Sequence, residues 1–248
     1  MSTESPAGAA RTGRPLPLLV LDYPGERPEA RVCELGLPGT RDVLAVPPPP
    51  VTPDRYLSAL SAPAPAGAVL AYCAAAPLAA ALAARVGREG REGRGVPLVL
   101  FDAEPVTAAT VLTAYRDTVA QLGLVPGPAE VRELAARVAD PGAFLTTARA
   151  RLTGHVGTAL GADGADAADV ADLAGPMTDA ALRWLAHLLA AHHTPPPRPT
   201  GPTLRVLSAH TPGDGVRIPS DRAELLRDPR TYRAVASFLT AHGALTDD

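Results

Sequence analysis

The stretch "VLAYCAAAPLAAALAARVG", Val69 to Gly87, decides the fold. Its first residues form a short apolar run, typical of a strand buried in a parallel sheet, and an alanine-rich helical pattern starts directly after Cys73. A nucleophile at such a strand-to-helix elbow follows the pattern G-x-S-x-G, where small residues are needed because strand and helix nearly collide. Residues 71–75 read Ala-Tyr-Cys-Ala-Ala, with alanine in place of both glycines. Cys73 is therefore either a nucleophile or a small packing residue.

The rest of the chain alternates predicted strands with predicted helices. Short apolar runs predict strands over Leu16–Tyr23, Asp42–Pro50, Gly67–Tyr72, Val96–Asp102 and Thr203–His210. Helical spacing and helix-start signals predict helices over Thr52–Ala62, from Ala74 onward, and over Met177–His193 and Asp228–Leu245. Residues 30–37 fit either a strand or a short helix. This alternation predicts an α/β fold with a doubly wound, mostly parallel sheet.

The middle of the chain, residues 107–193, carries only helical patterning. Leu134 and Val138 are four residues apart and share one helical face, and Phe144 adds another apolar anchor. A helical block inside an α/β chain is typical of a lid. We therefore predict one domain over residues 16–248 with an inserted helical lid, preceded by a disordered segment over residues 1–15.

Composition excludes several classes of function. The net charge of −3 and the lack of a basic stripe argue against nucleic acid as a partner. Two cysteines do not make a disulfide scaffold, and the N-terminus lacks a secretory signal. No apolar run approaches the ~18 residues of a membrane span. The acidic stretch "DGADAAD" lacks calcium-ligand spacing, and no His/Cys cluster suggests zinc. We expect a soluble cytoplasmic protein without a metal or cofactor.

A carboxylate ends the strand that follows the elbow helix. Asp102 stands twenty-nine residues after Cys73, in "LVLFDAEP". An acid at the tip of a neighbouring strand reaches the same edge of the sheet, which is the place of the orienting acid in a catalytic triad. The alternative is that Asp102 caps the following turn.

The order of these blocks resembles a known family. The stretches "GAVLAYCAAAPLAAALA", "PLVLFDAEP" and "HHTPPPRPTGPTLRVLSA" are similar to the elbow, the acid-bearing strand and the lid-to-strand connection of thioesterases of nonribosomal peptide and polyketide biosynthesis, type II thioesterases included. The resemblance covers roughly residues 16 to 245 and implies an α/β-hydrolase fold. It also implies Cys73 as nucleophile and Asp102 as the acid of the triad.

The position of the family's histidine departs from the pattern. That histidine precedes "LL" and the final helix, and the matching stretch here, residues 220–226, reads "SDRAELL" with Arg222 in its place. Arginine keeps its proton at physiological pH and cannot act as a general base. Without the resemblance, Arg222 reads as a solvent-facing residue paired with Asp221 or Glu224.

Another histidine is a possible base. His210, just past the last predicted strand, is the best placed, because sites form at the carboxyl edge of the sheet. The remaining histidines fit the lid, the surface or helix ends: His155, His187, His192, His193 and His242.

These residues favour one kind of chemistry. A thiol at a helix N-terminus near a guanidinium should have a lowered pKa and attack a thioester without a base, whereas water remains difficult to activate. The oxyanion hole is expected from the amide of Ala74 and from an amide near Tyr23, because Pro24 has no amide hydrogen. Cys33 is expected to be a core or strand residue without a function.

The resemblance and the departure together give three hypotheses. The first is cysteine-based acyl transfer, or slow thioester hydrolysis, on acyl or peptidyl chains carried by the phosphopantetheine of a carrier protein in antibiotic-type secondary metabolism. The second is a degenerate thioesterase-fold protein that binds a carrier domain or an acyl product as a scaffold. The third is a hydrolase in which His210 serves as base.

Overall fold

The computed structural model describes residues 16–24, 30–43, 53–60, 65–90, 95–162, 167–195 and 201–245. The prediction for residues 1–15 lies outside this part of the chain.

Within the described residues, six strands form one parallel sheet in the order β2-β1-β3-β4-β5-β6. Their bounds are β1 Leu18–Leu21, β2 Thr40–Asp42, β3 Ala68–Tyr72, β4 Leu98–Phe101, β5 Thr203–Leu207 and β6 Val216–Arg217. The central strands β1, β3 and β4 are apolar and almost wholly buried. Strands covered on both faces are expected to be continuous apolar runs, and this is why the sequence predicted them well.

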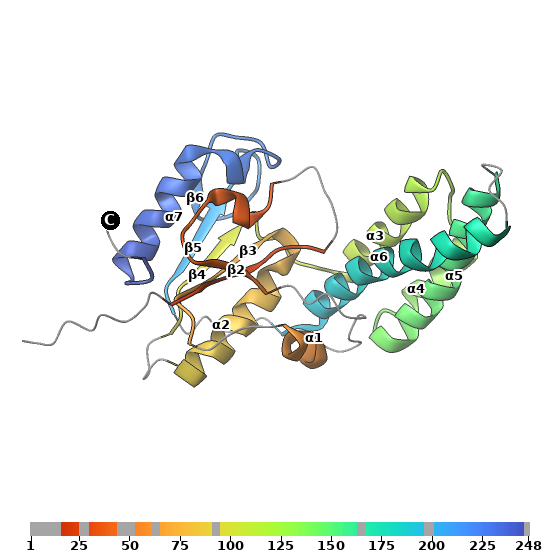
Figure 1. Ribbon diagram of the computed structural model, residues 1–248, viewed down its shortest axis with the longest axis horizontal. Coiled ribbons are helices and arrows are strands. Elements are labelled where there is room, and N and C mark those ends of the chain that lie inside the picture. The colour runs from red at the N-terminus through yellow and green to blue at the C-terminus, as the bar shows by residue number, and fades with distance from the viewer. Residues whose placement is uncertain are drawn as a thin grey trace, which may run out of the picture.

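Alternation along each strand divides the core between the two faces of the sheet. In β3, for example, Leu70 and Tyr72 face one hydrophobic cluster, while Val69 and Ala71 face another. The first cluster is covered by the 3-10 turns η1 (Val32–Leu35) and η3 (Leu225–Arg227) and by α7 (Pro229–Ala241). The second is covered by α1 (Pro53–Ala59) and α2 (Ala76–Gly90). Figure 1 shows α7 and α2 on opposite sides of the sheet.

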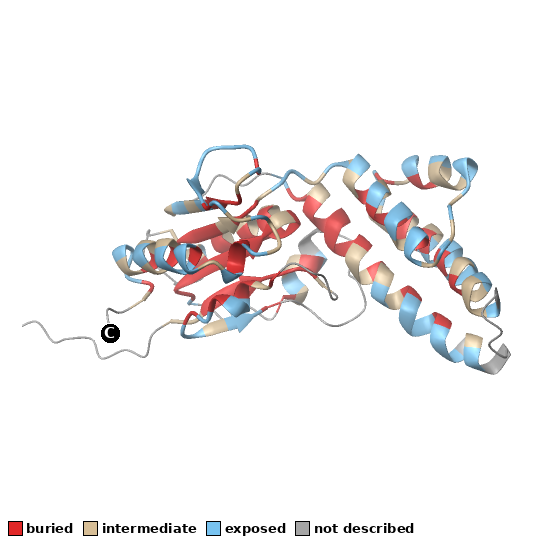
Figure 2. Ribbon diagram, turned by 90° about the horizontal axis from the view of Figure 1, so that it is seen from above, coloured by how far each residue is buried: buried red, intermediate tan, exposed pale blue. Residues whose placement is uncertain are grey.

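The chain between β4 and β5 forms a helical unit beside the sheet (Figure 1). Its helices are α3 Ala108–Gln121, α4 Pro128–Ala135, α5 Pro141–Ala162 and α6 Ala167–His193. They enclose a third apolar cluster that includes Leu134, Val138 and Phe144. The C-terminal part of α6 is buried against the body of the protein (Figure 2), where it contacts α1, α2 and the elbow turn η2 (Cys73–Ala75). A parallel sheet, a strand-to-helix elbow and an inserted helical lid confirm the predicted α/β-hydrolase fold.

Two local predictions were wrong. The strand expected over Asp42–Pro50 lies earlier, at Thr40–Asp42, and residues 44–50 are outside the described part of the chain. Cys33, expected in the core, is exposed in η1, where its neighbours Val32 and Leu35 take the buried positions.

Candidate functional site

Cys73 lies at a sharp turn between β3 and α2. It is one of two non-glycine residues in the described chain with positive φ, at 51°, a conformation that costs an L-residue about 1–2 kcal/mol. The turn fits because Ala71 and Ala75, at the positions where glycine is usual, are completely buried. Cys73 itself is partly exposed. A strained residue that presents a thiol above the sheet is the geometry of a nucleophile elbow.

Asp102 occupies the equivalent place at the end of the next strand. Tyr72 pairs with Phe101 in the parallel register, so Cys73 and Asp102 leave neighbouring strands side by side. Asp102 is the other residue with positive φ, at 42°, and is fully buried. Its Oδ1 accepts a hydrogen bond from the amide of Ser208 at 2.8 Å, and its Oδ2 has no hydrogen-bond partner among the described residues. The carboxylate therefore ties β4 to β5 and leaves one oxygen available.

Arg222, which follows Cys73 by 149 residues in the sequence, contacts its sulfur. Its Nη2 lies 2.5 Å from Sγ, and its Nη1 lies 2.6 Å from Oε1 of Glu104. Its Nε donates to the hydroxyl of Tyr72 at 3.3 Å. The predicted surface pairing of Arg222 with Asp221 or Glu224 is wrong, because the side chain points to the elbow. The arginine at the expected histidine position is thus at the thiol.

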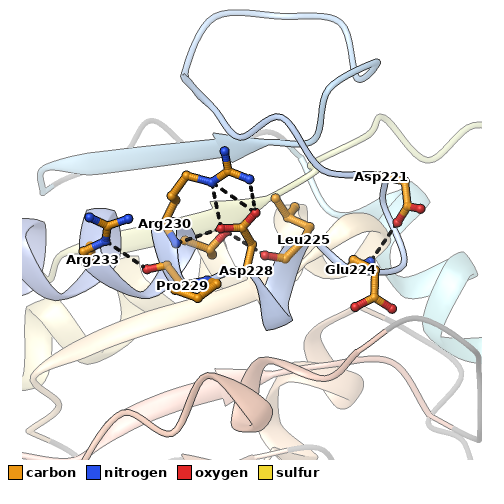
Figure 3. A network of polar contacts seen from close by, with 8 residues as sticks. Asp221, Glu224, Leu225, Asp228, Pro229, Arg230 and Arg233 are labelled. Carbon is orange, nitrogen blue, oxygen red and sulfur yellow. Dashed lines mark hydrogen bonds and ion pairs between the residues drawn. The ribbon is translucent and has the colours of Figure 1, made fainter.

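The loop that carries Arg222 is held by polar contacts on both sides of η3 (Figure 3). Oδ1 of Asp221 accepts from the amide of Glu224, and Asp228 caps α7 and pairs with Arg230. Leu225 is fully buried below, and its carbonyl accepts the hydroxyl of Thr231 at 2.6 Å. These contacts fix the main chain near Arg222.

The electrostatics of the site keep Arg222 and Tyr72 protonated. Burial lowers the pKa of Arg222, but the charge of Cys73, the Tyr72 hydrogen bond and the charge of Glu104 outweigh it and leave that pKa raised. Burial raises the pKa of Tyr72, against the smaller opposing effect of Arg222. Arg222 therefore acts as a fixed cation beside the sulfur and has no means of accepting a proton.

Most histidines of the described chain bond to groups outside the elbow. His210 sits in an exposed turn after β5 and makes no hydrogen bond or ion pair with another described residue. Four others hydrogen-bond to residues outside the elbow: His155 to Glu130, His187 to Tyr56, His192 to the carbonyl of Val106 and His193 to the carbonyl of Val138. His242 packs edge-on against the ring of Phe238. His192 and His193 are thus half-buried tethers and do not cap their own helix. The carboxylate of Asp102 accepts from the amide of Ser208, and Arg222 supplies a side-chain contact to Sγ of Cys73.

The two predicted oxyanion positions flank the elbow. Ala74 is buried in the first turn of the helix that follows Cys73, where amides lack intrahelical partners. Leu21 pairs with Ala71, so the chain leaves β1 beside the elbow and continues into Tyr23, whose ring centroid lies 6.1 Å from that of Tyr72. Whether these amides stabilise an oxyanion stays a prediction.

The lid closes the other side of the site. Trp184 of α6 packs against both of the apolar clusters that also contact Cys73. Its ring stacks on His187 at 5.7 Å between centroids, and Nδ1 of His187 is 2.8 Å from the hydroxyl of Tyr56 on α1. The thiol therefore lies between an apolar surface from the lid and a charged surface from Arg222 and Glu104.

Two members of this site escaped sequence reasoning. Tyr72 was considered only as the variable residue of the elbow motif, and Glu104 only as part of "DAEP". The signal for Tyr72 was its place directly before the nucleophile. Glu104 gave no signal, because an exposed acid in a loop resembles any other.

Two structural features were looked for in the described part of the chain. No group of three or more His, Cys, Asp or Glu side chains is placed to hold a metal ion in the part that the structure describes. Among the helices described, none combines the length and apolar character that a bilayer crossing requires.

Comparisons with known proteins give only low similarity. No family model matches the sequence, and a search of curated proteins finds no match. Among solved structures, the Vlm2 thioesterase domain is similar at 16% identity over 90% of this chain and 93% of its own, with a TM-score of 0.41. An epoxide hydrolase of the α/β-hydrolase superfamily, from metagenomes of hot environments, is similar at 12% identity over 92% and 90%, with a TM-score of 0.38.

Proposed function

We propose that this protein is thioesterase-like and transfers acyl groups, with Cys73 accepting an acyl or peptidyl group from a thioester. The observation that carries the proposal is the contact of 2.5 Å between Nη2 of Arg222 and Sγ of Cys73 at a strained elbow. A fixed guanidinium favours the thiolate over the thiol, and the thiolate is the nucleophilic form. No base is then needed for the first step.

In that step the thiolate attacks the carbonyl carbon of the substrate thioester. The resulting oxyanion would be held by the amide of Ala74 and by a second amide near Tyr23. When the intermediate collapses, the bond between carbon and the substrate sulfur breaks, a thioester forms on Cys73, and the departing thiolate takes a proton from solvent. The substrate thiol we propose is the phosphopantetheine arm of a carrier protein, in the cytoplasm, in secondary-metabolite biosynthesis.

The second step distinguishes transfer from hydrolysis. A second thiolate attacks the Cys73 thioester without help, and the energies of the two thioesters are nearly equal. Water has to lose a proton, and Arg222 in contact with the sulfur is permanently charged, while the raised pKa of Tyr72 keeps that hydroxyl protonated, so neither residue can accept it. We therefore propose transfer between thiols as the main reaction, with slow hydrolysis beside it.

A second function is favoured by the same contact. A guanidinium that donates to sulfur also reduces its intrinsic nucleophilicity, because more acidic thiols are weaker nucleophiles. In this alternative, the protein binds an acyl product or a carrier domain as a scaffold and performs no chemistry.

Mass spectrometry of the intact protein separates the two functions. The protein is incubated with an acyl-pantetheine thioester and, separately, with an acyl carrier protein. Acyl transfer predicts an adduct that maps to Cys73, is absent in Cys73→Ala, persists in Cys33→Ser, and is released faster by added pantetheine than by water. Binding that is unchanged in Cys73→Ala, with no adduct at any time, would reject the enzyme and support the scaffold.

A further inference from the structure

The hydroxyl of Tyr72 makes two contacts with one residue. It donates to the main-chain carbonyl of Arg222 at 3.3 Å and accepts from Nε of the same arginine at 3.3 Å. A phenol has one proton to donate and lone pairs to accept with, so both bonds form together. Tyr72 thereby links the main chain of Arg222 to the base of its guanidinium.

Tyr72 is itself firmly placed. It is the last residue of β3, 2% exposed, with its ring in the cluster that faces η3 and α7. The guanidinium carbon of Arg222 lies 5.8 Å from the centroid of this ring, within cation–π range. Burial raises the pKa of Tyr72, so its hydroxyl keeps the proton that it donates.

An arginine side chain does not hold one orientation by itself. It has several rotatable bonds, and about 2 kcal/mol of rotamer entropy opposes a single geometry. The polar contacts of the surrounding loop, drawn in Figure 3, join Asp221 to Glu224 and Asp228 to Arg230, so they hold the main chain on either side and not the Arg222 side chain. The other side-chain anchor is Glu104, whose side chain is 47% exposed, and exposed ion pairs restrain weakly.

We propose that Tyr72 is a positioning residue, which holds the guanidinium of Arg222 in the orientation where Nη2 meets the sulfur of Cys73. The strand-to-helix elbow thus supplies the nucleophile, Cys73, and in the preceding residue, Tyr72, the group that orients the guanidinium of Arg222. The consequence for acyl transfer rests on the proposed function. The consequence for thiol reactivity does not.

The test is the pH profile of Cys73 alkylation by iodoacetamide, in a Cys33→Ser background so that one thiol reacts. Tyr72→Phe keeps the ring and removes both hydrogen bonds of the hydroxyl. We expect about threefold slower alkylation at pH 7, an effect at the low end of the range for an ordinary hydrogen bond, because Glu104 still pairs with the guanidinium. The inflection of the profile should move to higher pH. Tyr232→Phe, an exposed tyrosine on α7, is the matched control and should leave the profile unchanged.

A double-mutant cycle separates positioning from general packing. In an Arg222→Gln background, Tyr72→Phe should have no further effect on the profile, because the cation that it aims is gone. An equal effect in both backgrounds, or an unchanged profile in a folded Tyr72→Phe protein, overturns the proposal. If that variant folds poorly, 3-fluorotyrosine at position 72 keeps ring and hydroxyl, weakens the hydroxyl as an acceptor, and should move the profile in the same direction.

The outcomes for the two proposals are independent. Failure to find an acyl adduct on Cys73 rejects the proposed function and leaves the alkylation result standing. A missing shift in Tyr72→Phe, with acyl loading intact, rejects the role of Tyr72 alone.

Discussion

Replacing Arg222 by glutamine should slow every reaction of the Cys73 thiol at neutral pH. Glutamine keeps hydrogen-bonding capacity and removes the charge. The structure places the guanidinium at the sulfur, with the arginine side chain 35% exposed, so water screens the interaction only in part. Removal of the cation therefore shifts the thiol–thiolate balance toward the thiol.

The magnitude follows from Coulomb's law. Two unit charges 4 Å apart interact by about 1 kcal/mol in water and about 4 kcal/mol at an effective dielectric constant near 20. Because of the partial exposure we take about 2 kcal/mol, which lowers the ratio of thiolate to thiol about 30-fold. The remaining thiolate is more basic and about fivefold more nucleophilic, since the Brønsted coefficient is about 0.4–0.5. The net expectation is alkylation slower by about sixfold at pH 7.

The assay is the iodoacetamide profile of Cys33→Ser protein with and without Arg222→Gln. The matched control is Arg149→Gln in the lid, which loses a surface pair with Asp179 and should react as the parent does. Added salt should narrow the difference between Arg222→Gln and the parent, because the charge is partly exposed. Equal or faster alkylation in Arg222→Gln across the pH range would refute the electrostatic role of this residue.

Three further predictions concern hydrolysis, pH and the lid. Arg222→His replaces the cation in contact with Cys73 by an imidazole, which can accept a proton from water, so release of acyl groups from Cys73 to water should rise about 10²-fold or more, as measured by free acid. Intact loading with unchanged release would contradict this. Burial raises the pKa of Asp22 to about 7 from an ordinary 3.8, so the folded protein loses stability as pH rises from about 4 to about 7. Asp22→Asn still accepts from the amide of Val32, and it should raise the free energy of unfolding at pH 8 by about 2–4 kcal/mol. Denaturant titrations should also show a weaker dependence of stability on pH, and a steep dependence that persists in the variant would contradict the role of Asp22. Tyr56→Phe leaves Nδ1 of buried His187 without its hydroxyl partner and should cost about 1–3 kcal/mol in the same titration, and an unchanged unfolding midpoint would show that this bond does not hold the lid.

The sequence predicted the centre of the fold better than its edges. β1, β3 and β4 are buried on both faces, so their apolar runs are visible without knowledge of their neighbours. The edge strand β2 is Thr40–Asp42, polar and largely exposed, and the apolar residues that follow it drew the prediction too far along the chain. The edge strand β6 is two exposed residues and left no pattern at all.

For the site, the sequence indicated positions and could not indicate contacts. The small residues around Cys73 and the acid at the end of the next strand follow from backbone constraints that any such elbow obeys. The arginine was found through its place before "LL", but its orientation depends on Tyr72 and Glu104, which lie 150 and 118 residues away along the chain. Side-chain direction over such separations is decided by packing, which a single sequence does not display.

The helix α6 has a mechanical consequence. It is one helix from Ala167 to His193, and it contributes both to the outer pairing with α5 and to the buried contacts with α1, α2 and the elbow. Trp184, which packs against the same apolar clusters as Cys73, therefore belongs to the same helix as the outer lid residues. A partner that tilts the outer end of α6 would also shift the part of this helix that contacts the elbow turn. Binding of a partner at the lid and access to the sulfur of Cys73 would then be coupled.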